Sequence, residues 1–322
     1  MKINKNNFFR NAVITLYLIF CSYMVGVKNP DVWKDYFVYL KYFDDAKNNI
    51  FYILTNVQDP LFVILMHPFA SVNNGFDVFL FSCAFITLSL KLFSIRRATE
   101  HFGVFIILYS AYLLCLHDYI QIRVALALAF FIFALYGVSN KVKKNIVFVI
   151  ALFCHLSIIV PMLIYYACNS KVIGYKKVIL LAPSIILFSF LIQRGAIFID
   201  RVNQYLELQK DGIGIDINIF STLPLVQLVT ILIIIFSKKY ENHKNTYEFV
   251  MAYVGVIIFY STLSIPAVAL RCFEISNVFF IVLLSRLLFK SYYFMLIFFI
   301  YIVIGIKNYG QLLDIKIPFL TM

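Results

Sequence analysis

A succession of long apolar segments separated by short charged clusters is the feature that most constrains how this chain can fold. Ten such segments occur, at 11–27, 78–95, 102–117, 122–138, 146–167, 178–193, 219–236, 247–266, 270–285 and 291–306, with a shorter one near 60–72. Of the 322 residues, 62% are apolar and 14% are charged. Soluble domains carry about 25% charged residues. The pattern excludes a soluble enzyme, a nucleic-acid-binding module and a disulfide scaffold. It predicts an all-α, polytopic integral membrane protein with about 9–11 transmembrane helices.

The basic residues indicate the orientation of the chain. The net charge is +12, and cytoplasmic loops of membrane proteins collect Lys and Arg. Five clusters between apolar segments are therefore predicted to be cytoplasmic: Arg96 and Arg97, grouped with Lys91; Lys141, Lys143 and Lys144; Lys171, Lys176 and Lys177; Lys238, Lys239 and Lys244; Arg286 and Lys290. Lys2, Lys5 and Arg10 precede the first segment, which lacks a cleavage site. This favours an uncleaved signal anchor with a cytoplasmic N-terminus.

Two segments conflict with this orientation if they cross the membrane. The segment at 60–72 is short and has Pro60 and Pro68 near its ends, which is typical of an interfacial or re-entrant helix. The segment at 146–167 lies between two basic clusters. Either it is a broken hairpin that turns near His155 and Pro161, or the following loop lies outside against the rule. With the hairpin, nine segments span, in a single transmembrane domain over 1–322 with outer loops at 28–77 and 194–218.

The first outer loop combines carboxylates with aromatic rings. It carries Asp31, Trp33, Asp35, Tyr36 and Tyr39, and then Asp59 directly before Pro60. Trp33 and the tyrosines could stack against a sugar, and Asp31 or Asp35 could accept a hydroxyl proton. The alternatives are an interfacial aromatic belt and, for Asp59, an N-cap followed by proline at the first helical position.

Arginine stands near the ends of two apolar segments. Gln121 and Arg123 follow His117 and Asp118 at the predicted outer mouth of a span. A charge there is costly unless it snorkels, pairs with an anion or lines a wet cavity. The planar guanidinium suits a pyrophosphate. This predicts an anion site at Arg123.

Arg271 belongs to a stretch, 249–289, that contains few charges and is too long for one span. The chain must turn within it, and we expect the turn between Pro266 and Arg271. Arg271 would then lie at the outer face like Arg123. Glu274, three residues further on, offers a helical ion pair as the alternative.

His155 lies inside an apolar segment, where Ser157 offers either a structural hydrogen bond or, at a chain turn, exposure of the imidazole to a polar cavity. The remaining histidines show no metal-ligand spacing, and no P-loop or nucleophile motif occurs. The six cysteines lie in or beside apolar segments and are interpreted as packing residues. We therefore expect no metal and no cofactor.

In their order and spacing, five short motifs resemble the EpsG-like and Wzy-type bacterial polysaccharide polymerases. They are DVWKDY from Asp31, DPLF from Asp59, QIRVALA from Gln121, FCHLS from Phe153 and LRCF from Leu270. The resemblance covers about residues 30–275. It implies a glycosyltransferase that joins oligosaccharide repeat units carried on undecaprenyl pyrophosphate at the periplasmic face of the inner membrane.

This resemblance also implies roles and partners. Arg123 and Arg271, with Gln121, Trp33 and Tyr36, would bind substrate, and Arg123 and Arg271 would stabilise the pyrophosphate leaving group. Asp31, Asp59 and His155, in that order, are the candidates to accept the proton of the acceptor hydroxyl. The partners would be the lipid-linked donor and acceptor, membrane lipid and a chain-length regulator, and no nucleic acid.

Three other functions remain open. A lipid-linked oligosaccharide flippase would also attract pyrophosphate with arginines, but transporters of this kind typically show internal repeats, and none is visible. An O-antigen ligase would use a similar donor. A structural membrane protein would not need polar residues concentrated at the outer helix ends.

Overall fold

The computed structural model describes residues 5–28, 30, 33, 35–48, 59–170, 174–180, 182–193, 207 and 217–313. These residues form helices and their connections, and no strand occurs among them, which confirms the predicted all-α class. The chain divides into two compact units, which are described separately. The first comprises Met1–Glu100, Tyr112–Ile158 and Lys307–Met322, and the second comprises His101–Ala111 and Ile159–Ile306.

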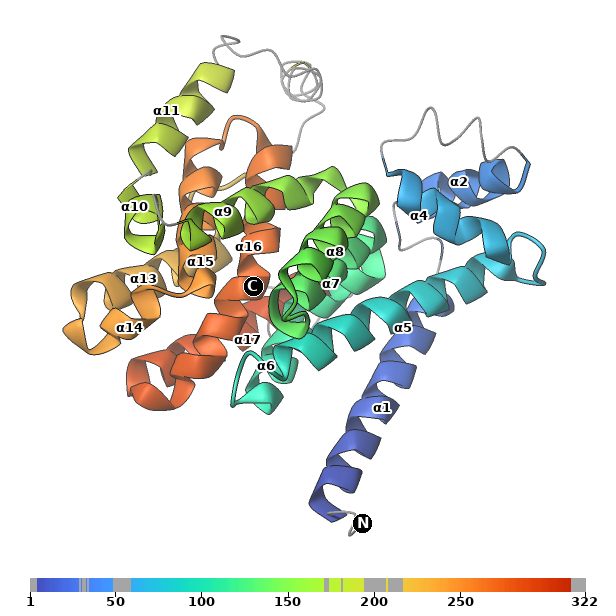
Figure 1. Cartoon of the computed structure of the whole chain (residues 1–322), viewed down its shortest axis with the longest axis horizontal. Helices are drawn as coiled ribbons and strands as arrows, with labels where there is room; N and C mark the ends of the chain where they lie inside the picture. Colours follow the sequence, from blue (N-terminus) through green and yellow to red (C-terminus); the bar gives the residue numbers. More distant parts are fainter. Residues whose placement is uncertain are drawn as a thin grey trace. The chain divides into compact units, whose positions relative to one another are not determined.

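The first unit is organised around the long apolar helix α5 (Gly75–Ile95), which packs against α1 (Lys5–Gly26) and α7 (Ile122–Ile132). The other helices of this unit are α2 (Tyr36–Asn48), α4 (Pro60–Met66), η1 (His67–Phe69), most of η2 (Tyr109–Ile120), η3 (Phe133–Gly137), α8 (Lys141–Cys154) and η4 (Leu156–Ile158). Figure 1 shows α7 and α8 side by side, and α8 also contacts α4. The short helices α2 and α4, which lie between α1 and α5 in the sequence, are thereby brought to the start of α7.

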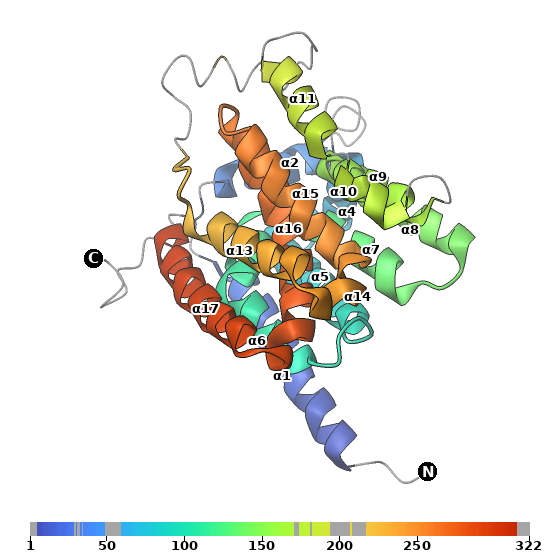
Figure 2. The same cartoon turned by 90° about the vertical axis from the view of Figure 1, so that its left-hand side faces the viewer.

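The second unit centres on α15 (Tyr247–Ser261) and α16 (Pro266–Leu287), which lie side by side in Figure 2. A side chain at Gly255 of α15 would collide with Ser276 of α16, so glycine permits the close approach of the two helices. The other helices are α6 (Phe102–Leu108), α9 (Ile159–Asn169), α10 (Gly174–Leu180), α11 (Ala182–Gln193), α13 (Thr222–Phe236), η5 (Lys238–Tyr240), α14 (Glu241–Lys244), η6 (Leu288–Lys290) and most of α17 (Tyr292–Leu312).

Five helical stretches in the described part of the chain are long and apolar enough to cross a membrane. They are Phe9–Gly26, Gly75–Ile95, Phe102–Ile120, Pro266–Lys290 and Tyr292–Leu312. Thr222–Phe236 with Lys238–Lys244, bent by 97°, would make a sixth. The predicted segments at 122–138, 146–167, 178–193 and 247–266 form shorter apolar helices. The chain is a polytopic membrane protein, and breaks in its helices divide several apolar runs that the sequence shows as continuous.

Two of these breaks fall at or near predicted positions. His155 is extended, with φ −166° and ψ 129°, and separates α8 from η4. This confirms a break at His155, while the choice between a hairpin and a crossing stays a prediction. The turn expected between Pro266 and Arg271 lies earlier, between Ser261 and Pro266, because proline begins α16 and needs no backbone N–H there.

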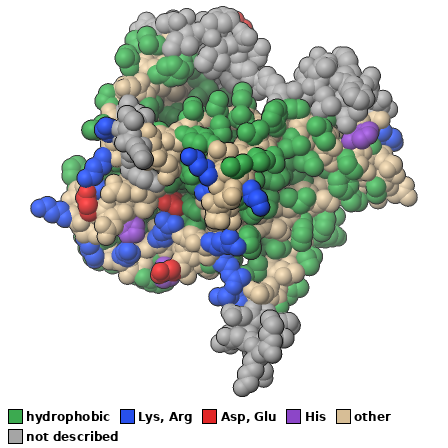
Figure 3. Space-filling model, viewed as in Figure 1, with side chains coloured by type: hydrophobic (Ala, Val, Ile, Leu, Met, Phe, Trp, Pro, Cys, Tyr) green, Lys and Arg blue, Asp and Glu red, His purple; other side chains and the backbone are tan. Residues whose placement is uncertain are grey.

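Large apolar side chains on α1 and α17 remain exposed. They include Phe9, Leu16 and Phe20 on α1, and Leu296, Phe299 and Val303 on α17. Figure 3 shows that hydrophobic side chains cover wide areas of one face of the molecule. Such surfaces are rare on soluble monomers and suit contact with lipid tails.

One pair of charges corrects the predicted position of Lys91. Lys91, which the sequence grouped with the cytoplasmic Arg96 and Arg97, lies 2.8 Å from the carboxylate of Asp118, which was placed at the outer mouth. The side chains are 1% and 0% exposed. The two assignments cannot both hold, because the Lys91 and Asp118 side chains form a buried ion pair within the helices. Lys91 is therefore a buried partner in the first unit rather than a loop charge.

Candidate active site

Arg123 is the centre of the candidate site, in the second position of α7. The helix begins after Gln121, whose φ of −100° and ψ of 57° interrupt the helical course of η2. Most of α7 beyond Arg123 is apolar and buried, which fixes the direction of its first turn. The Arg123 side chain is 25% exposed. It is therefore held by the fold and remains partly accessible.

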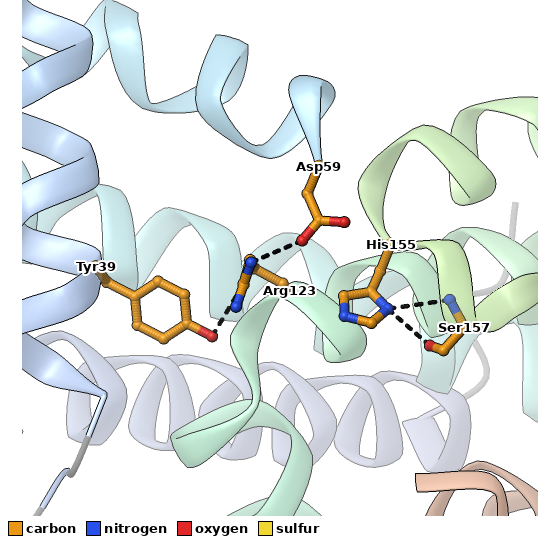
Figure 4. A network of polar contacts seen from close by, with 5 residues as sticks. All are labelled: Tyr39, Asp59, Arg123, His155 and Ser157. Atoms are coloured by element: carbon orange, nitrogen blue, oxygen red, sulfur yellow. Dashed lines mark hydrogen bonds and ion pairs between the residues drawn. The ribbon is translucent and has the colours of Figure 1, made fainter. Parts of the chain in front are cut away.

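Two groups from the segment between α1 and α5 hold the guanidinium of Arg123. Its Nη1 donates a hydrogen bond to Asp59 Oδ2 at 2.8 Å, and its Nε donates to the Tyr39 hydroxyl at 3.3 Å (Figure 4). Asp59 is 6% exposed on its side chain. The rings of Tyr39 and Tyr42 lie 5.2 and 5.8 Å from the guanidinium carbon, at cation–π distances. The sequence did not single out Tyr42.

The role of Asp59 differs from the helix cap that the sequence offered as its alternative. Asp59 does precede α4 with Pro60 at the first helical position, but it makes no side-chain capping hydrogen bond. Its carboxylate pairs with Arg123 instead. The predicted N-cap position of Asp59, with Pro60 at the start of the helix, is therefore confirmed, but the carboxylate joins the DPLF and QIRVALA motifs through the ion pair instead of capping α4.

His155 belongs to the same unit, and Figure 4 shows its imidazole on the side of Arg123 opposite Tyr39. The backbone N–H of Ser157 donates to His155 Nδ1 at 3.1 Å, and the Ser157 hydroxyl lies 2.8 Å from the same nitrogen. Because Nδ1 accepts the backbone hydrogen bond, the neutral ring carries its proton on Nε2. In this tautomer the Nε2–H of His155 is a hydrogen-bond donor, and Nδ1, the basic nitrogen, already accepts from Ser157.

A family model for the EpsG family matches residues 11–311. The chain belongs to the EpsG family. No curated protein and no solved structure matches it.

Family membership confirms the resemblance that the five motifs indicated. It identifies the chain as a membrane protein of the polysaccharide-polymerase type, and its activity in general terms as that of a glycosyltransferase-like polymerase. Three of the motifs, DPLF, QIRVALA and FCHLS, contribute Asp59, Arg123 and His155 to the first unit of this EpsG-family protein.

The aromatic residues predicted to form a sugar-stacking platform occupy different environments. Trp33 is 1% exposed. The Lys28 Nζ lies 3.2 Å from the centre of its ring, and Tyr39 stacks on it at 4.9 Å. Tyr36 is half-buried against Trp33 and Phe76, and burial together with the nearby Asp77 raises the pKa of its hydroxyl. Tyr36 is thus the more accessible candidate for sugar stacking, and its hydroxyl stays neutral near pH 7.

Two predicted residues cannot be placed beside Arg123. Asp31 lies outside the described residues. Arg271 belongs to the second unit, in the second turn of α16, where its Nη1 is 3.7 Å from Glu274 Oε2. This distance fits the helical ion pair offered as the alternative, but it is too long for a hydrogen bond. A convergence of Arg123 and Arg271 stays a prediction. In the described part of the chain, no three His, Cys, Asp or Glu side chains are grouped as metal ligands.

Proposed function

We propose that this EpsG-family protein transfers a growing oligosaccharide from undecaprenyl pyrophosphate to a sugar hydroxyl of an incoming lipid-linked repeat unit. The proposal places the reaction at the periplasmic face of the inner membrane, with the N-terminus in the cytoplasm. The observation that carries it is the guanidinium of Arg123, held by Asp59 and Tyr39 and still 25% exposed. A held, partly desolvated cation is what a pyrophosphate leaving group requires.

In the proposed reaction, the acceptor hydroxyl oxygen forms a bond to the anomeric carbon of the donor sugar. The bond between that carbon and the pyrophosphate oxygen breaks, and undecaprenyl pyrophosphate leaves with the electron pair. Arg123 stabilises the negative charge that develops on the departing oxygen. This interaction strengthens in the transition state and therefore raises the rate of the chemical step.

A base must accept the proton of the acceptor hydroxyl. Asp31, Asp59 and His155 remain the candidates. Asp59 is a carboxylate beside Arg123, and it could take the proton once pyrophosphate competes for the guanidinium. The Nε2–H tautomer of His155 favours a donor role toward a phosphate or sugar oxygen. Gln121, Trp33, Tyr36 and Arg271 remain proposed substrate-binding residues, and a chain-length regulator remains a proposed partner.

The test is the surface-polysaccharide profile of a strain that lacks this gene, with and without a plasmid copy. A polymerase mutant should lose the ladder of long chains and retain a single attached repeat unit. Loss of every unit would indicate a flippase or a ligase instead. An unchanged ladder would contradict the proposed function.

A second test uses purified full-length protein and a synthetic lipid-linked repeat unit without any nucleotide sugar. The expected products are lipid-linked dimers and longer chains, with one undecaprenyl pyrophosphate released per bond formed. Product formation only in the presence of a lipid A core acceptor would assign the ligase activity.

A further inference from the structure

The end of η2 is bound by charged and aromatic side chains that take no part in the bond-forming and bond-breaking steps proposed above. Its Asp118 carboxylate oxygen Oδ1 accepts hydrogen bonds from Lys91 Nζ at 2.8 Å and from Thr87 Oγ1 at 2.9 Å, both on α5. All three side chains are buried. A buried charge pair inside a membrane protein is expensive and marks a functional constraint.

The next two residues of η2 are bound through their backbone. Lys28 Nζ donates to the Tyr119 carbonyl at 2.8 Å, and Trp33 Nε1 donates to the Ile120 carbonyl at 3.0 Å. Lys28 is 6% exposed and also lies over the Trp33 ring. The last three residues of η2 thus each accept a hydrogen bond from a side chain in another segment of the first unit.

The backbone explains why these donors are needed. η2 is π-helical, and the Gln121 N–H closes its hydrogen-bond ladder on the Leu116 carbonyl at 2.9 Å. The carbonyls after Leu116 fall at the end of the ladder, where helices leave acceptors without intrahelical partners. A buried carbonyl must be satisfied by another donor. Lys28 and Trp33 supply donors to two of them.

We propose that Lys28, Trp33 and Lys91 are positioning residues that fix the end of η2 and thereby the direction in which α7 presents Arg123. Arg123 follows Asp118 by five residues, across the single break at Gln121. The inference rests on the proposed function of Arg123. It gives Trp33 a role through its indole N–H, which differs from the sugar stacking that the sequence suggested.

The first test is Trp33→Phe, which keeps an aromatic ring and removes the indole N–H. We expect kcat of the purified protein with the lipid-linked repeat unit to fall about tenfold and KM to stay within about twofold. A purely structural loss would lower the amount of folded protein and leave kcat per folded molecule unchanged. Wild-type kcat in Trp33→Phe would overturn the inference.

A matched control is Tyr247→Phe in the second unit. The Tyr247 hydroxyl is also a buried aromatic donor to a backbone carbonyl, that of Pro161, at 2.7 Å. This variant should lose comparable thermal stability and keep kcat. An equal fall in kcat for both variants would show a general structural effect and contradict the positioning role.

The second test places Trp33→Phe in an Arg123→Lys background. If Trp33 acts through Arg123, the additional loss of kcat should be less than about twofold, because residues that act as a unit are not additive. Independent, multiplicative losses would overturn the inference. If Arg123→Ala keeps wild-type kcat, the proposed function fails. If Trp33→Phe keeps wild-type kcat while Arg123→Ala loses it, the proposed function stands and only the positioning role fails.

A separate variant tests the buried ion pair of Lys91 and Asp118. The double substitution Lys91→Met and Asp118→Leu replaces it by apolar side chains, an exchange that proteins often tolerate. We expect the protein to accumulate and kcat to fall about tenfold, as for Trp33→Phe. If the double variant accumulates with wild-type kcat, Lys91 has no positioning role. If it fails to accumulate, Lys28→Met provides the same test at the neighbouring carbonyl.

Discussion

The two units contain arginine–carboxylate pairs with nearly the same local geometry. In the first unit Arg123 lies 2.8 Å from Asp59, with side chains 25% and 6% exposed, and in the second Arg286 lies 2.9 Å from Glu248, with 25% and 4%. Distance and burial therefore do not distinguish them. What differs is the set of groups around each pair.

The surroundings of Arg123 are aromatic and polar, with Tyr39 and Tyr42 from α2 and His155 from the break after α8. Arg286 instead ends α16 in a basic region. The nearby Lys290 bonds to His243, and its carbonyl accepts from Lys239. The positive charge of Lys290 repels that of Arg286, and these side chains do not form a site for a sugar. The comparison indicates that the side chains around each ion pair, rather than the ion pair itself, distinguish the proposed site at Arg123 from the pair at Arg286.

The largest expected difference between the pairs comes from removing each arginine. Arg123→Ala should lower polymerisation per folded molecule by about 10²–10³-fold, the loss typical of removing a donor to a developing anion. Arg286→Ala should reduce accumulation, because Glu248 is left buried and unpaired, and keep the activity of each folded molecule within about twofold. Both are measured by chain formation and by immunoblot. If both variants lost the same activity per folded molecule, the proposed difference in function between Arg123 and Arg286 would be contradicted.

Replacing each arginine by lysine tests the same difference between Arg123 and Arg286. Arg123→Lys should retain activity about tenfold above that of Arg123→Ala, because charge remains but the planar fork is lost. Arg286→Lys should be nearly neutral in both accumulation and activity. The measurement is kcat with the lipid-linked unit, and full activity of Arg123→Lys would argue against a bidentate phosphate contact.

The carboxylate partners provide the next comparison. Asp59→Asn should lower kcat about tenfold, because the amide can still accept from Arg123 but no longer carries charge. Glu248→Gln should leave kcat unchanged. If Asp59→Asn is as inactive as Arg123→Ala, Asp59 is assigned the role of proton acceptor.

The smallest expected effect is a pH dependence in the second unit. Burial, with Lys290 and Arg286 nearby, lowers the pKa of His243, in the polar connection after α13. The stabilisation from keeping this histidine neutral is complete above about pH 6.5, its ordinary value. It is lost as the pH falls through that value toward the lower folded pKa.

Thermal unfolding of the purified protein at pH 7 and pH 5 measures this effect. The loss should be less than about 1 kcal/mol, because His243 is partly exposed and screened. His243→Gln, which stays neutral, should reduce the difference between the two pH values. An unchanged difference would show that other groups cause it.

The sequence predicted the helical class but not which of its candidate residues contact one another. Charge in an apolar segment and the DPLF and QIRVALA motifs identified Arg123 and Asp59 separately. Their pairing depends on α4 packing against α8 and α8 against α7, which no local pattern encodes. The sequence offered a cap for Asp59 because capping is the local solution, and the tertiary ion pair replaced it.

Lys91 shows why the grouping of basic residues was wrong at one position. The positive-inside rule counts lysines near span ends and cannot recognise one that is neutralised by a carboxylate from another helix, as Lys91 is by Asp118. Two such residues within otherwise apolar segments are a signal for a buried pair. That signal was present in the sequence, but their pairing required the structure.

The π-helical course of η2 makes the length of this segment as important as its composition. In an α-helix each residue turns the chain by about 100°, and π-helical turns accommodate extra residues without lengthening the ladder in proportion. Deleting a single residue between Tyr109 and Ile120 should restore ordinary turns and rotate the start of α7 toward another face, with every functional side chain still present. The number of residues in η2 is thus constrained as well as their identity. Insertions or deletions here should be more harmful than most substitutions.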